Sequence, residues 1–123
     1  MPHLIKDPIL TSSYMIGMFQ SIISRNVNPV ESAVISVTKL NAGTNYNIIP
    51  NVVTLQGTTR HFQPHIQEMI EARMKEVVAG VSVSMGVEAE IRYERRYPPT
   101  VNSEKETNHA IQAASRVVGE EKV

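Results

Sequence analysis

Two short polar stretches contain the residues with the clearest potential for binding chemistry. Residues 45–50 (NYNIIP) read as a polar loop that ends in apolar residues, and residues 57–60 (GTTR) place one arginine among small residues. A guanidinium can bind a carboxylate through two parallel hydrogen bonds, and an asparagine amide can donate another. Asn47 and Arg60 are therefore candidates for a carboxylate-binding site. The structural alternatives are a turn for Asn47 and a surface ion pair for Arg60.

The histidines do not form a metal-binding pattern. His61 and His65 are four residues apart, but a strand-to-helix junction is expected between them, and no carboxylate motif accompanies them. His3 and His109 stand alone in the sequence. There is no cysteine, no Gly-x-Ser-x-Gly pattern and no phosphate-binding glycine loop. We therefore expect no metal site and no catalytic residue in this chain.

Composition excludes several classes of function. The 123 residues fit one domain, and 41% of them are hydrophobic, which is enough for a packed core. Twelve basic residues balance twelve acidic ones, and the basic cluster at residues 92–96 is interleaved with glutamate, which argues against a nucleic-acid partner. No apolar run is long enough to span a membrane, and the first ten residues do not resemble a signal peptide. A cytoplasmic location is the expectation.

The first half of the chain predicts a helix and two strands. Asp7-Pro8 is typical of a helix start, and apolar residues at helical spacing continue to about Arg25. Residues 32–40 are rich in β-branched side chains and predict a strand, which a breaker at residues 41–43 should end. Residues 52–62 predict a second strand, in which Gly57 indicates a bulge or a close approach by another group.

The second half predicts a helix, a strand and a last helix. A helix should begin at Pro64, with only a weak cap from Gln63, and end at Gly86. Residues 87–97 alternate apolar and charged side chains and predict a third strand. A capping box at residues 103–106 should open a helix over residues 104–118. This order predicts an α+β fold, in which a three-stranded antiparallel sheet carries two helices on one face and a further helix follows.

Several motifs in the same order resemble the lid domain of the aminoacylase/carboxypeptidase-like metallopeptidases. The similarity is greatest to the amidohydrolases related to hippurate hydrolase, N-acetyldiaminopimelate deacetylase and the auxin-conjugate hydrolases. It extends over essentially the whole chain and is carried by residues 1–3, 7–8, 24–27, 32–34, 41–50, 57–62, 93–95 and 97–102.

This resemblance implies a ferredoxin-like lid domain that dimerises edge to edge. It also implies a separate catalytic domain with two divalent metal ions (zinc, or alternatively manganese or cobalt) and a glutamate as general base. None of those metal-binding motifs occurs here, so we expect the chain to be inactive alone. The family's first lid strand and its Gly-His-Ala-Ala segment would precede Met1. Residues 1–101 would then be a lid domain without its first strand, and residues 102–123 the start of the returning catalytic segment.

The resemblance also implies roles for individual residues. Asn47 matches a loop asparagine that contacts the substrate, Arg60 matches an arginine associated with the substrate's carboxylate, and His3 matches a Pro-His motif. The whole protein would hydrolyse the amide bond of N-acyl amino acids or related small amides. It would form a homodimer through a sheet edge from Ser32 to Leu40. The alternative is a free-standing α+β domain that binds a protein or a small molecule without catalysis.

Overall fold

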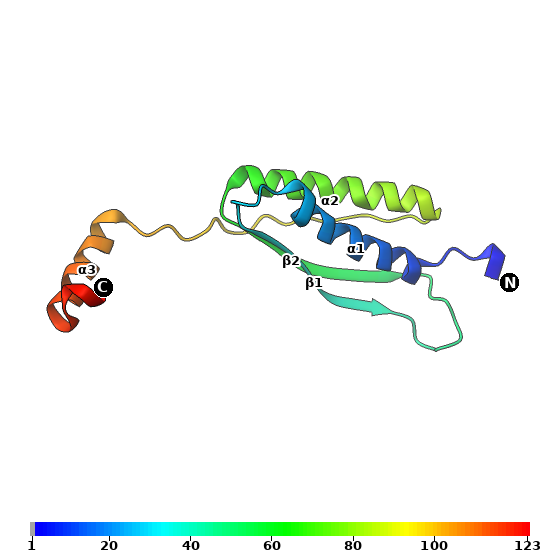
Figure 1. The fold of residues 1–123 in the computed structure, drawn as a ribbon. Coiled ribbons are helices and arrows are strands. Elements are labelled where there is room, and N and C mark those ends of the chain that lie inside the picture. Colours follow the sequence, from blue (N-terminus) through cyan, green and yellow to red (C-terminus); the bar gives the residue numbers. More distant parts are fainter. Residues whose placement is uncertain (1) are drawn as a thin grey trace.

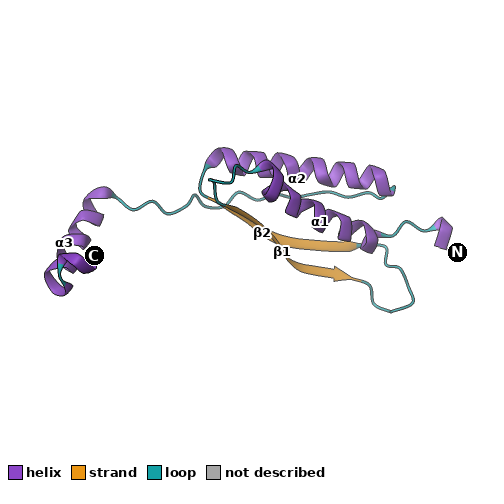
Figure 2. Ribbon diagram, in the orientation of Figure 1, coloured by secondary structure: helices purple, strands orange, loops and turns teal. Residues whose placement is uncertain are grey.

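Two helices cover one face of a two-stranded antiparallel sheet (Figures 1 and 2). The structure is a computed structural model, and it describes residues 2–123. Its elements in chain order are η1 (Pro2–Leu4), α1 (Pro8–Asn26), β1 (Ala33–Ala42), β2 (Val53–His61), α2 (Pro64–Met85), α3 (Glu104–Val118) and η2 (Glu120–Lys122). The predicted α+β class is confirmed.

Capping groups define the start of α1 and the end of α2. The Asp7 carboxylate accepts hydrogen bonds from the backbone N–H groups of Ile9 (2.9 Å) and Leu10 (3.1 Å). These two donors have no partner inside the helix, so the cap stabilises its first turn. At the other helix, Gly86 adopts a φ of 66° and its N–H donates to the Val83 carbonyl. Only glycine takes this left-handed conformation without strain, so α2 ends there as predicted.

The remaining two caps also agree with the sequence. Gln63 makes no side-chain hydrogen bond to the start of α2, as expected for a weak cap. The Ser103 hydroxyl oxygen accepts from the Glu106 N–H (3.5 Å), and the Glu106 carboxylate bonds back to that hydroxyl. The bond from the Glu106 N–H to Ser103 is the forward half of the predicted capping box, but the return bond goes to the Ser103 hydroxyl and not to its backbone N–H; α3 begins immediately after this cap, at Glu104.

The hairpin register depends on Gly57. Val37 pairs with Gly57, the next pair is Lys39 with Gln56, and Thr38 is left over as a bulge in β1. A Cβ atom at position 57 would lie 2.3 Å from the Ser36 carbonyl oxygen. The sequence indicated a bulge or a close approach at this glycine, and both are found: the backbone approaches at Gly57, and the extra residue lies on the opposite strand.

The hydrophobic core lies between the helices and the inner face of the sheet. Ile22 of α1 and Ile70 of α2 are fully buried and join the two helices to each other. Ile35 is the buried contribution of β1. The remaining buried apolar residues are Met15, Phe19, Val27, Ile66, Val77, Val78 and Val81. Ile9 and Leu10, which share the predicted apolar stripe of the first helix, are about half exposed because the stripe extends past the end of the core.

The predicted third strand is wrong: residues 87–97 make no strand ladder in the described part of the chain. They run as an extended segment beside the helix–sheet layer (Figure 1). Ile91 and Tyr93 face the core as the alternation predicted, and Glu88 and Glu90 are exposed. Alternation specifies which face is apolar, but it does not supply a neighbouring backbone about 4.8 Å away to hydrogen-bond with. The sheet therefore has two strands.

The last helix stands apart from this layer. None of the residues of α3 is buried, and Figure 1 shows it beyond the end of the sheet, joined through the extended segment. Within residues 2–123, no helix combines the length and the apolar character needed to cross a bilayer.

The close approach at Gly57 generates a stability prediction. Gly57→Ala should lower the free energy of unfolding by about 1–3 kcal/mol, because the added Cβ forces the two strands apart. Gly80→Ala is the matched control, since nothing lies within 4 Å of a Cβ there and the residue is inside α2. It should stabilise by about 0.4–1 kcal/mol. Urea denaturation followed by circular dichroism measures both, and equal effects of the two changes would contradict the steric argument.

Candidate functional site

The hairpin has one face that no helix covers, which we call the open face. Residues paired across two strands point to the same side of a sheet. Ile35 and its partner Thr59 point toward the helices, so the alternate pairs point away from them. The open face consists of Val34, Ser36, Lys39 and Asn41 on β1 and of Arg60, Thr58, Gln56 and Thr54 on β2. All but Val34 can hydrogen-bond to a ligand.

The open face is cationic although the chain as a whole is neutral. Residues 32–67 contain no aspartate or glutamate, which lie at positions up to 31 and from 68 onward. Lys39 and Arg60 are the two charged residues of the open face. Neither forms an ion pair within the described residues. An anion placed on this surface would meet two free cations and no carboxylate.

Arg60 is exposed near the end of β2 and pairs across the strands with Val34. Its guanidinium makes no hydrogen bond to any other described residue. The structural alternative from the sequence, a surface ion pair, is therefore wrong for this side chain. A guanidinium without a partner keeps its planar set of donors free for a carboxylate.

Asn47 lies in the loop that connects β1 to β2. The loop makes a turn in which the Ile48 N–H donates to the Asn45 carbonyl (3.4 Å), so the turn expected for Asn47 is found. Beside it is a hollow of about 550 Å³, lined by Ile9, Ala42, Gly43, Thr44, Asn45, Tyr46, Asn47, Ile48 and Ile49. Tyr46 and Ile48 are exposed in this loop. The loop therefore presents one amide together with apolar surface.

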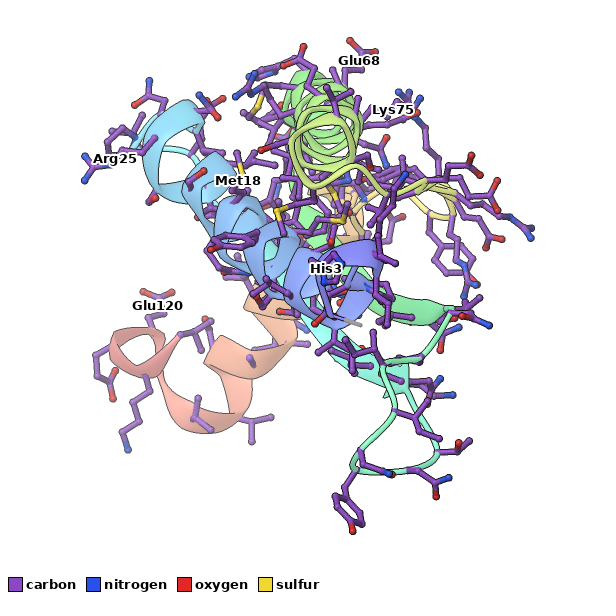
Figure 3. All side chains as sticks on the ribbon, turned by 90° about the vertical axis from the view of Figure 1, so that its right-hand side faces the viewer. His3, Met18, Arg25, Glu68, Lys75 and Glu120 are labelled. Carbon is purple, nitrogen blue, oxygen red and sulfur yellow. The ribbon has the colours of Figure 1, made fainter. Side chains whose placement is uncertain are left out.

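The three residues predicted to bind substrate are not brought together within one chain. His3 is exposed at the end of the molecule where the chain starts, the end that faces the viewer in Figure 3. The loop with Asn47 lies toward the same end, because Ile9 of the first turn of α1 lines its hollow. Arg60 lies seven residues along β2 from Val53, which is roughly 24 Å of strand at the spacing of an antiparallel sheet.

A second hollow, which the sequence did not indicate, lies where β2 leads into α2. It measures about 250 Å³ and is lined by His61, Phe62, Pro64, Gln67, Arg95, Arg96, Tyr97, Pro98 and Pro99. The Nδ1 atom of His61, one of these residues, is buried without a hydrogen-bond partner among the described residues. No spacing in the sequence could have indicated this hollow, because its lining comes from two separate segments, residues 61–67 and residues 95–99.

Two side-chain contacts hold the extended segment against this region. The Tyr93 hydroxyl is hydrogen-bonded to the Thr59 hydroxyl at 2.6 Å, and the Arg95 guanidinium donates to the Glu71 carboxylate at 2.8 Å. Hydrogen bonds from Lys75 and Arg95 hold the pKa of the Glu71 carboxyl below its usual value, and the bond to Glu71 raises the pKa of Arg95. The segment is thus attached by side chains and not by a backbone ladder.

The histidines occupy separate environments. His61 ends β2 and His65 lies in the first turn of α2, so the predicted junction does separate them. His65 contacts the Glu31 carboxylate at 2.7 Å. Within residues 2–123, no three His, Cys, Asp or Glu side chains lie close enough together to hold a metal ion.

Comparisons with known proteins identify relatives of the chain by sequence and by fold. No protein-family model matches the chain. The chain is 37% identical over 122 residues to the amidohydrolase YhaA of Bacillus subtilis (strain 168), covering 99% of this chain and 31% of that protein. It is 39% identical over 111 residues to the N-acetyldiaminopimelate deacetylase of Anoxybacillus flavithermus, covering 90% and 29%.

Two solved structures share its fold. An aminohydrolase from methicillin-resistant Staphylococcus aureus matches with a TM-score of 0.79 and 25% identity, covering 95% of this chain and 30% of that one. The YXEP protein of Bacillus subtilis, described as a dinuclear metal-binding peptidase of the M20 family, matches with a TM-score of 0.68 and 30% identity, covering 90% and 28%. The chain is homologous to part of the M20-type amidohydrolases.

The share of each relative that the chain covers limits the homology to one part of those proteins. The chain spans only about 30% of the length of the curated M20-type relatives it matches. The similar region is one segment of those proteins, and the family resemblance seen in the sequence is confirmed at that level. The dinuclear metal centre is a property of the YXEP protein, and the described residues of the present chain contain no comparable cluster.

The contact between Glu71 and Arg95 generates a pH prediction. Because the pKa of Glu71 is lowered in the folded chain, its contribution to holding the segment is complete above the ordinary value of 4.5 and is lost as the pH falls through the lowered value. The Arg95 Nε–H signal in NMR spectra should therefore lose protection from exchange only below pH 4.5. Glu71→Gln should remove this pH dependence, and Glu76→Gln, on the same helix, should leave it unchanged. Protection that does not change with acidity would contradict the assignment.

Proposed function

We propose that this chain is the dimerisation and lid segment of a metal-dependent amidohydrolase. The whole enzyme would hydrolyse the amide bond of N-acyl amino acids or related small amides. Support comes from the homologues, which are amidohydrolases and deacetylases, and from the share of their length that the chain spans. The two divalent metal ions and the residues that activate water would belong to the remaining part of the enzyme. The whole enzyme would be located in the cytoplasm.

The observation that carries the proposal is the free guanidinium of Arg60 on an acid-free surface. N-acyl amino acids carry a carboxylate, and Arg60 can bind it through two charge-assisted hydrogen bonds. No carboxylate in residues 32–67 competes for the same donors. Asn47 would add an amide hydrogen bond from the hairpin loop of the second copy in the proposed dimer, because the loop of the same chain lies at the other end of the hairpin. His3, exposed at the start of the chain, would lie at the margin of the substrate site.

The chain would divide near residue 101. Residues 1–101 would form the lid segment, and residues 102–123 would begin a return to the catalytic domain. Ile111 and Val118 of α3 are each a little less than half exposed, and none of the residues of this amphipathic helix is buried. A helix with an apolar stripe needs a packing partner. The catalytic domain is the partner that we propose for it.

Two copies would associate through the outer edge of β1. In the described chain β1 pairs with β2 alone, so its other edge carries backbone groups outside any ladder. The predicted edge, Ser32 to Leu40, coincides with most of this strand, and it has no proline and no acidic residue. One acceptor is already used, because the Gln20 amide donates to the Ile35 carbonyl at 3.4 Å. An antiparallel pair of β1 strands would satisfy the remaining groups about a two-fold axis.

Loss of Arg60 should impair the intact enzyme without unfolding it. Arg60→Ala should lower kcat/KM on N-acyl amino acids by roughly 10-fold or more, since a hydrogen bond to a charged group is worth about 1.5–3 kcal/mol. Arg25→Ala is the control, because Arg25 is exposed at the far end of α1 and lies on the helix layer (Figure 3). Steady-state kinetics on both variants, with circular dichroism to verify folding, measures whether Arg60 contributes to substrate binding. A folded Arg60→Ala enzyme with an unchanged rate would remove the residue from the site.

The edge contact has a matched pair of variants at Val37. Val37→Pro removes a backbone N–H in the middle of β1, and Val37→Ala makes a similar loss of packing while keeping the N–H. Sedimentation at micromolar concentration should give a dimer for the unmodified chain and for Val37→Ala, and a folded monomer for Val37→Pro. A monomeric unmodified chain, or a dimeric Val37→Pro chain, would show that β1 is not the contact.

A further inference from the structure

The bulge in β1 determines on which face of the sheet Lys39 lies. In a regular strand alternate residues share a face, so Lys39 would lie on the inner face with the buried Ile35. The extra residue Thr38 shifts this alternation, and Lys39 pairs with Gln56 on the open face. Bulges are frequent beside active sites, where they redirect a side chain. Lys39 is thereby placed on the same surface as Arg60.

Lys39 and Arg60 are separated by a length that one small ligand can bridge. Arg60 lies four residues along β2 from Gln56, the cross-strand partner of Lys39, which is roughly 14 Å of strand. Side chains stand roughly perpendicular to a sheet, and these two are long enough to lean toward each other. The exposed side chains of Thr58 and Gln56 lie between them and offer further hydrogen-bond donors. We call these four residues the cationic row.

No carboxylate of the hairpin neutralises the cationic row. Aspartate and glutamate are absent from residues 32–67, and none of the ion pairs among residues 2–123 includes Lys39 or Arg60. A surface lined by one sign of charge raises the local concentration of a ligand with the opposite charge. Two cations at this separation suit a ligand that carries two anionic groups.

We propose that Lys39 is a specificity-determining residue, which binds a second carboxylate in the side chain of the substrate. This inference rests on the proposed function, in which Arg60 binds the first carboxylate of an N-acyl amino acid. The substrate class is then the N-acyl derivatives of acidic amino acids such as glutamate. A guanidinium holds one carboxylate in a fixed geometry, whereas a lysine ammonium is a point charge on a flexible stem. Lys39 can therefore follow acidic side chains of different length.

A matched pair of substrates tests the role of the second carboxylate. N-acetyl-L-glutamate and N-acetyl-L-glutamine have nearly the same shape and differ by one negative charge in the side chain. The intact enzyme should show a kcat/KM roughly 10-fold or more higher for the glutamate compound, because only its side chain forms a charge-assisted hydrogen bond with Lys39. Lys39→Met should remove this preference and leave the rate on the glutamine compound unchanged. Lys39→Arg, which keeps the charge, should retain most of the preference.

Lys75→Met is the control for the loss of one positive charge. Lys75 lies on α2, which covers the other face of the sheet, so this variant should keep the preference (Figure 3). Circular dichroism verifies that each variant is folded. Hydrolysis of both compounds without a preference, or a preference that survives in Lys39→Met, would overturn the role of Lys39 and leave the proposed function standing. An intact enzyme that hydrolyses no N-acyl amino acid would overturn the proposed function and this inference with it.

Discussion

The packing of two helices on a single face of a narrow hairpin is the constraint from which the other features follow. Ile22 and Ile70 are completely buried where α1 meets α2, and Ile35 joins the sheet to them. Burial of each such side chain stabilises the fold by roughly 1.5–3 kcal/mol. All of this burial is on the inner face. The opposite face and the outer edge of β1 are therefore left uncovered within the described chain.

Charge follows the same division between the two faces. The acidic residues lie before residue 32 or after residue 67, and several of them form ion pairs on the helices and on the extended segment, such as Glu71 with Lys75 and Arg95. The hairpin has none, so Lys39 and Arg60 are not neutralised locally. A chain with zero formal net charge thus presents one cationic surface, and the overall composition gives no sign of it. Only the pairing of β1 with β2 reveals which residues share that surface.

The parts of the fold that depend on neighbouring residues were predictable, and those that depend on a distant backbone were not. Asp7, Gly86 and Ser103 act on the helix turn beside them, so the helix ends follow from local chemistry. Residues 87–97 have the alternation of a strand and face the core accordingly, yet a ladder needs a partner that alternation cannot provide. The site shows the same limit. Residue type made Asn47 and Arg60 candidates, but whether Arg60 has an ion-pair partner, and how far the two residues lie from each other, depends on the pairing of β1 with β2.

The bulge at Thr38 has a consequence for how far assembly can go. A long, regular sheet edge can pair in many registers and can add copies without end, which is how fibrils grow. The extra residue breaks β1 into two short regular stretches. If a second β1 strand paired with this edge in a shifted register, the bulges of the two strands would no longer occupy equivalent positions. On the other side of the sheet, the extended segment lies alongside, tied to Thr59 through Tyr93 and bearing Glu88, Glu90 and Glu94 outward. One edge is thus limited in register, and the other lies beside a segment that carries charged side chains of both signs, with Glu94 paired to Arg92 and Arg96; both features work against open-ended stacking.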